Sequence, residues 1–165
     1  DVLSALRACR DNAQQIDIVV HARRFFEKDV LDKVLLYAEK IGAEIHKGAL
    51  EPNTYNEIWS SLDAVMLSYN VDKYSRCGSG MFFEALSDAI VPIVPDNTSM
   101  AAVAREAQVG IVYDAGDPAG LTNATKGLID DLDRLASASR EFAPVWREKN
   151  TPSRVLDLLE TAWAS

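Results

Sequence analysis

The feature that most constrains the fold of this chain is a regular alternation of short apolar runs with longer stretches of helical periodicity. The apolar runs predict β-strands, and they span residues 16–22, 43–47, 63–69, 90–94 and 109–113. Most of them lack strict polar alternation, which is typical of strands covered on both faces. The alternation therefore predicts an α/β fold in which a Rossmann-like parallel sheet carries helices on both faces.

Helical periodicity fills the intervals between these runs. The predicted helices span residues 1–15, 30–41, 54–62, 81–89 and most of the chain after Pro118. Thr54 is expected to cap the helix that it begins. A break is expected near Pro144 and a last helix after Pro152, because proline disrupts a helix interior and suits a first turn. These C-terminal helices are expected to pack on the sheet.

Size and charge narrow the classes of function. The 165 residues fit one domain, 1–165, and the 17 Lys and Arg against 25 Asp and Glu leave a net charge of −8. An acidic chain without a basic cluster gains little from binding nucleic acid, which we therefore do not expect as a partner. The longest uncharged apolar stretch, residues 89–95, is far shorter than the roughly 20 residues of a membrane-spanning helix.

Cysteine usage and the start of the chain bear on its compartment. Cys9 and Cys77 are too few and too isolated for a disulfide framework or a zinc site. Residues 1–15 lack the apolar core of a signal peptide. We therefore expect a cytoplasmic protein without a bound metal.

Basic residues follow several of the predicted strands. Arg23 follows the first strand, Lys47 ends the second and Arg76 follows the third, although the chain as a whole is acidic. The carboxyl ends of parallel strands meet at one edge of a sheet, where ligands bind. We expect the loops that carry Arg23, Lys47, Arg76 and Asn97 to converge there on an anionic ligand.

The loop before the predicted helix 81–89 is rich in glycine. Gly78 and Gly80 permit a close backbone approach and positive φ at the turn, and Ser79 lies between them. The first N–H groups of a helix have no partner within it, and such a terminus binds phosphate. Arg76 can add a charge-assisted hydrogen bond to the same oxygens. A tight turn without a ligand is the structural alternative.

Glu84 lies one turn into this otherwise apolar helix. It is either a first-turn acid that interacts favourably with the helix dipole or a carboxylate that accepts hydrogen bonds from ribose hydroxyls. His21 and His46 have no partner at ligand spacing, so hydrogen-bonded structural roles are expected for both. Cys77 precedes a helix start without a histidine nearby in the sequence, which argues against a nucleophile.

The segment from Tyr74 through Glu84-Ala85 to the strand Val91-Pro92-Ile93-Val94 resembles a known family. It is similar to the C-terminal, donor-binding half of GT-B glycosyltransferases, above all the retaining, metal-independent enzymes that use nucleotide-diphospho-sugars. In that family a Glu-x7-Glu motif surrounds a helix start, ends in Glu-Ala and precedes a Pro-Val-Val strand. The resemblance covers most of the chain.

The resemblance implies roles for individual residues. Gly78, Ser79, Gly80 and Glu84, with Arg23 and Lys47, would bind the nucleotide diphosphate of the donor, and no metal or other cofactor would be required. Arg76 stands eight residues before Glu84, where the family has its first Glu, a residue expected to touch the donor sugar. A basic residue there would instead neutralise the diphosphate and stabilise it as it departs, which makes Arg76 the candidate catalytic residue.

The resemblance also implies a larger protein. The first strand of this half and the acceptor-binding half would precede Asp1, so the chain alone is expected to transfer no sugar to its polysaccharide or glycoconjugate acceptor. The full-length protein would be cytoplasmic, with a peripheral position at the inner membrane face as one option. Two alternatives stay open: a related sugar-nucleotide 2-epimerase, and a non-catalytic GT-B binding or assembly module.

Overall fold

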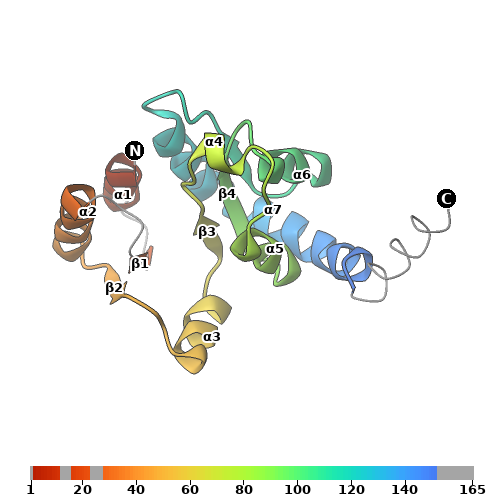
Figure 1. Ribbon diagram of the computed structural model, residues 1–165, viewed down its shortest axis with the longest axis horizontal. Helices are drawn as coiled ribbons and strands as arrows, with labels where there is room; N and C mark the ends of the chain where they lie inside the picture. The colour runs from red at the N-terminus through yellow and green to blue at the C-terminus, as the bar shows by residue number, and fades with distance from the viewer. Residues whose placement is uncertain (1, 12–15, 23–27, 152–165) are drawn as a thin grey trace. The chain divides into compact units, whose positions relative to one another are not determined.

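The computed structural model describes residues 2–11, 16–22 and 28–151. Their contacts divide the chain into two compact units (Figure 1). Unit 1 comprises Asp1–Leu62 and Tyr113–Asp130, and unit 2 comprises Asp63–Val112 and Asp131–Ser165. The expectation of a single ligand-binding domain stays a prediction.

Unit 1 is built around a pair of parallel strands. Its elements are α1 (Val2–Asp11), β1 (Val19–Ala22), α2 (Lys28–Lys40), β2 (Glu44–Lys47) and α3 (Pro52–Ser60). Val19 of β1 lies opposite Glu44 of β2, and Ala22 lies opposite Lys47. The helix α2 packs against both strands and buries Leu35 and Ala38. The two parallel strands and the helix that connects them therefore form a βαβ unit of the kind that the sequence predicts.

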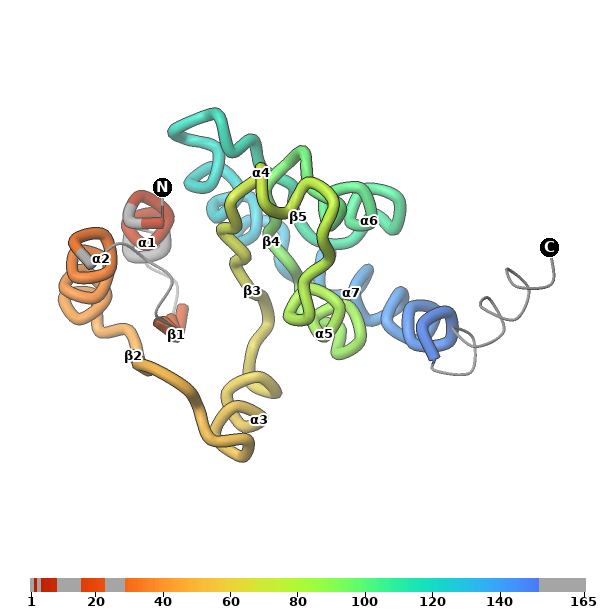
Figure 2. The backbone as a smooth tube through the Cα atoms, viewed as in Figure 1, coloured from red at the N-terminus to blue at the C-terminus, as the bar shows by residue number. Residues whose placement is uncertain are grey.

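Unit 2 contains most of a second, three-stranded sheet. Its elements are β3 (Ala64–Met66), α4 (Val71–Tyr74), α5 (Gly80–Ser87), β4 (Val91–Pro95), α6 (Ser99–Ala107), β5 (Ile111–Tyr113) and the second part of α7 (Gly120–Lys149). The strand order is β3-β4-β5, and β3 and β4 are parallel, with Met66 opposite Ile93. Figure 2 traces the chain from β3 through α4 and α5 to β4.

The core of unit 2 surrounds the central strand β4. All five residues of β4 are buried, which explains the continuous apolar run at this point of the sequence. The helices α5 and α6 both pack against β4. Phe82 and Met100 fill the core from these helices, and Trp146 of α7 packs against the same cluster. The expectation that a C-terminal helix packs on the sheet is therefore confirmed for α7.

The five predicted strands are all present, although most are shorter than the apolar runs that predicted them. The predicted start of one helix is wrong. That helix, α3, begins at Pro52 with Glu51 as its N-cap instead of at Thr54, because proline at the first position has the φ that a helix needs and no N–H to leave unpaired. The helices α4 and α6 were not predicted from the sequence.

The expected break near Pro144 is wrong as well. The helix α7 continues through Pro144, and its non-helical residue is Asp131, with φ −133° and ψ 23°. The Phe142 and Trp146 rings lie 6.1 Å apart on either side of Pro144, and both pack on the core of unit 2. This packing stabilises the helix and offsets the loss of the backbone hydrogen bond that proline cannot donate. The last helix, predicted after Pro152, lies outside the described residues.

Candidate functional site

The candidate site lies at the carboxyl edge of the sheet in unit 2. Because β3 and β4 are parallel, the loops that follow them begin at the same edge. The Ser99 hydroxyl, at the start of α6, donates a hydrogen bond of 2.8 Å to the carbonyl oxygen of Cys77, just before α5. The segments 76–80 and 96–99 are therefore in direct contact, and together we call them the sheet-edge site.

The start of α5 supplies hydrogen-bond donors to this site. Ser79 is the buried N-cap, and its Oγ accepts a hydrogen bond of 3.3 Å from the backbone N–H of Phe82. The N–H groups of Gly80 and Met81 have no acceptor within the helix, and the helix dipole adds partial positive charge at this end. This arrangement can hold an anion such as a phosphate group.

Gly78 makes room for the Phe83 ring. A Cβ at this position would lie 2.5 Å from Cζ of that ring, so a larger residue would require the exposed Phe83 side chain to shift. A Cβ at Gly80 would meet nothing within 4 Å, which leaves the approach to the helix start open. The described glycines with positive φ are Gly42, Gly48 and Gly110, so the positive φ considered for Gly78 and Gly80 is not used.

Two tyrosines from the loop after β3 support the N-cap. The Tyr69 hydroxyl lies 3.0 Å from Ser79 Oγ, and the Tyr69 ring stacks on Tyr74 with 4.2 Å between centroids. The short helix α4 brings Tyr74 into this stack. The Asn70 side chain caps α4 by accepting a hydrogen bond from the N–H of Lys73. Burial raises the pKa of Tyr69, so its phenol stays protonated at neutral pH. No role for Tyr69 was predicted from the sequence.

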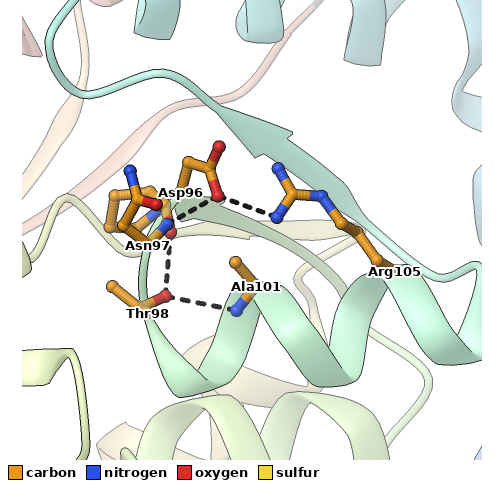
Figure 3. A network of polar contacts seen from close by, with 6 residues as sticks. Asp96, Asn97, Thr98, Ala101 and Arg105 are labelled. Atoms are coloured by element: carbon orange, nitrogen blue, oxygen red, sulfur yellow. Dashed lines mark hydrogen bonds and ion pairs between the residues drawn. The ribbon is translucent and has the colours of Figure 1, made fainter.

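The loop after β4 is held by a charged pair (Figure 3). Asp96 Oδ1 accepts a hydrogen bond of 2.7 Å from the Arg105 guanidinium and one of 2.6 Å from the N–H of Asn97. The hydrogen bond from Arg105, followed by that from Asn97, lowers the pKa of Asp96 and keeps its carboxylate ionised. Asn97 has φ 58°, a left-handed conformation that asparagine tolerates better than most residues. Thr98, next along, caps α6 by accepting from the N–H of Ala101.

Neither Asp96 nor Arg105 was singled out from the sequence. Their spacing of nine residues links a strand end to the last turn of α6, so no helical i, i+4 pattern marks them as partners. The cap at Thr98 was detectable, because threonine followed by an alanine-rich segment is a helix-start pattern.

The structure places Arg76 and Glu84 in unit 2. Arg76 is exposed in the loop before α5, and the part of the chain that the structure describes offers it no ion-pair partner within 4 Å. Glu84 is half-buried in α5, one turn after Gly80. The hydroxyl-binding role considered for Glu84 and the phosphate-binding role of Arg76 stay predictions.

Two further predicted binding residues come from earlier in the chain. Lys47 is exposed at the end of β2, and Arg23 lies outside the described residues. Of the four loops expected to converge, the structure joins those of Arg76 and Asn97. His21 Nε2 lies 2.8 Å from the Gly48 carbonyl oxygen, as expected for a structural histidine.

His46, on the neighbouring strand, also has a local partner, because its Nε2 lies 2.6 Å from Oε1 of Glu44. Among the described residues, no three His, Cys, Asp or Glu side chains are grouped so that they could hold a metal ion. No helix in residues 2–11 or 28–151 combines the length and apolar character needed to cross a membrane.

Comparison with known proteins shows likeness in structure and not in sequence. No family model and no curated protein matches the sequence. The fold matches Anabaena HepE in complex with UDP-glucose at a TM-score of 0.70 and 11% identity over 98% of this chain, and the complex with UDP at 0.68. The chain spans 44% of the HepE chain, less than half of its length.

A second protein has the same fold over almost its whole described length. The catalytic domain of cholesterol-alpha-glucosyltransferase from Helicobacter pylori matches at a TM-score of 0.63 and 16% identity, over 91% of both chains. At these identities the likeness is one of fold. The chain is therefore an α/β protein that shares the fold of the HepE and cholesterol-alpha-glucosyltransferase structures.

Proposed function

We propose that this chain is the donor-binding part of a GT-B glycosyltransferase that uses a nucleotide-diphospho-sugar. The observation that carries the proposal is the capped, open start of α5 at the sheet edge, in a fold shared with a structure that holds UDP-glucose. An anion bound there would accept hydrogen bonds from the N–H groups of Gly80 and Met81. The acceptor would bind to a separate half of the full-length protein.

The proposed mechanism is electrostatic. When the bond from the sugar to the diphosphate breaks, negative charge grows on the departing oxygens. Fixed N–H dipoles and the Arg76 guanidinium would stabilise that charge without a metal ion. Addition of a chelator should therefore leave binding of UDP unchanged.

Arg76→Ala tests the diphosphate contact. If Arg76 binds the β-phosphate, the substitution should weaken the binding of UDP by about 1–3 kcal/mol, the scale of a hydrogen bond to a charged group. The binding of uridine should be unaffected. The loss should shrink in high salt, because Arg76 is exposed and salt screens exposed charges. Ligand-observed NMR with UDP and uridine measures both effects, and equal losses for the two ligands would mean that Arg76 touches no phosphate.

Glu84→Gln tests the ribose contact. A carboxylate that accepts hydrogen bonds from ribose hydroxyls contributes to the binding of every ligand that contains the nucleoside. The binding of uridine, UMP and UDP should therefore weaken in each case by about 1–3 kcal/mol. The same NMR titrations separate this pattern from that of Arg76→Ala. A loss confined to UDP would contradict the assignment of Glu84 to ribose.

The replacement of the family's first Glu by Arg76 favours one second candidate, a GT-B binding or assembly module without catalysis. Titration of the unmodified chain with UDP and UDP-glucose distinguishes the two. A donor-binding domain binds both nucleotides, whereas an assembly module that has lost the site binds neither.

A further inference from the structure

The hydroxyl groups of Tyr69 and Ser79 form a pair with one hydrogen to spare. Ser79 Oγ accepts one hydrogen bond from the N–H of Phe82 and shares a second, at 3.0 Å, with the Tyr69 hydroxyl. Two hydroxyls hold two hydrogens, and the contact between them uses one. Within the described residues, neither side chain has another acceptor. One O–H donor therefore remains beside the start of α5.

Either hydroxyl can be the donor in the bond between them, and the spare hydrogen lies on Ser79 when Tyr69 is that donor. A phenol is the stronger donor of the two, and Ser79 Oγ has one lone pair left after accepting from Phe82. When Tyr69 donates to this lone pair, both lone pairs of Ser79 are occupied and only its hydrogen is free. Ser79 is 6% exposed, so bulk water has little access to that hydrogen, and a buried donor without an acceptor is costly.

We propose that Tyr69 is a positioning residue that orients the Ser79 hydroxyl so that its hydrogen donates to the diphosphate of a nucleotide-sugar at the start of α5. This proposal rests on the proposed function. The Ser79 donor joins the N–H groups of Gly80 and Met81, which lie on the two residues that follow it. Three uncharged donors on consecutive residues would then donate hydrogen bonds to one anion.

The tyrosine stack holds the Tyr69 hydroxyl in place. Tyr74 lies nearly parallel to Tyr69, at an interplanar angle of 11°, and restricts rotation of the Tyr69 ring. The Tyr74 hydroxyl has no hydrogen-bond partner among the described residues. Tyr74→Phe is therefore a matched control, because it removes a hydroxyl from the same stack without touching Ser79.

The experiment compares Tyr69→Phe with Tyr74→Phe in the full 165-residue chain, with UDP and uridine as ligands in NMR titrations. Tyr69→Phe frees the Ser79 hydroxyl to rotate. We expect it to lower the affinity for UDP about five- to tenfold and to leave the affinity for uridine unchanged. Tyr74→Phe should change neither. Thermal unfolding of each variant checks that the fold is retained.

Ser79→Gly completes a double-mutant cycle. Glycine is tolerated at an N-cap, so the helix start is kept while the hydroxyl is lost. In the Ser79→Gly background, Tyr69→Phe should cause no further loss of UDP affinity, because the hydroxyl that it orients is absent.

Three results would overturn the positioning role: unchanged UDP affinity in Tyr69→Phe, equal losses of UDP and uridine affinity, or full additivity with Ser79→Gly. Each of these leaves the proposed function standing, provided that the unmodified chain binds UDP. Absence of UDP binding by the unmodified chain would instead overturn the proposed function and this inference together.

Discussion

Replacing Phe82 with alanine is expected to lower the free energy of unfolding by about 3–5 kcal/mol, the usual cost of truncating a buried phenylalanine. Phe82 is fully buried in the cluster that joins α5, β4 and α6. Its removal deletes apolar contacts and leaves a cavity that neighbours such as Val94 and Met100 fill only in part. Urea denaturation followed by circular dichroism measures the change.

Phe83→Ala is the matched control for this prediction. Phe83 is the next residue of the same helix, but it is 42% exposed, with its ring against Gly78 and Trp146. Truncation there should cost less than about 2 kcal/mol, because much less apolar surface returns to water. Equal losses for the two variants would show that α5 does not present Phe82 to the core.

Gly110→Ala should also destabilise the chain strongly. Gly110 has φ +74°, and a Cβ there would lie 2.3 Å from the carbonyl oxygen of Pro92 on the neighbouring strand. The strained φ and the overlap together should cost about 2–5 kcal/mol, because β4 is buried on all sides and has no room to shift. The measurement is again the free energy of unfolding in urea.

Gly42→Ala separates the two causes. Gly42 has almost the same φ, +75°, but a Cβ there would meet nothing within 4 Å. It should therefore cost only the strain of the left-handed conformation, about 1–2 kcal/mol. If Gly110→Ala is no worse than Gly42→Ala, the close approach of Gly110 to Pro92 does not exist in solution.

The architecture was predictable because its causes are local. A continuous apolar run such as 90–94 has one stable environment, a strand covered on both faces, and the structure buries every residue of β4. The glycine-rich loop with Ser79 before an apolar segment likewise predicted the helix start of α5. Local patterns failed where packing outweighs them, as at Pro144, which the helix α7 passes through.

The sheet-edge site was only partly predictable, because its contacts join residues that are distant in the sequence. The bond from Ser99 to Cys77 spans 22 residues, and that between Tyr69 and Ser79 spans ten. Neither pair lies within a single helix or strand, so no periodic pattern marks the partners. The ion pair of Asp96 with Arg105 likewise joins the end of a strand to a residue nine positions later in α6.

By itself the sequence determined the class of fold, the order of strands along the chain and the helix start that is the centre of the site. Apolar periodicity and capping residues act over a few neighbouring positions, so they can be identified in the chain without its structure. Only the tertiary structure decided that Tyr69, Ser79, Cys77 and Ser99 meet at one edge of the sheet. That meeting depends on the parallel pairing of β3 with β4, which brings separate loops to the same edge, and strand pairing is a property of the folded chain.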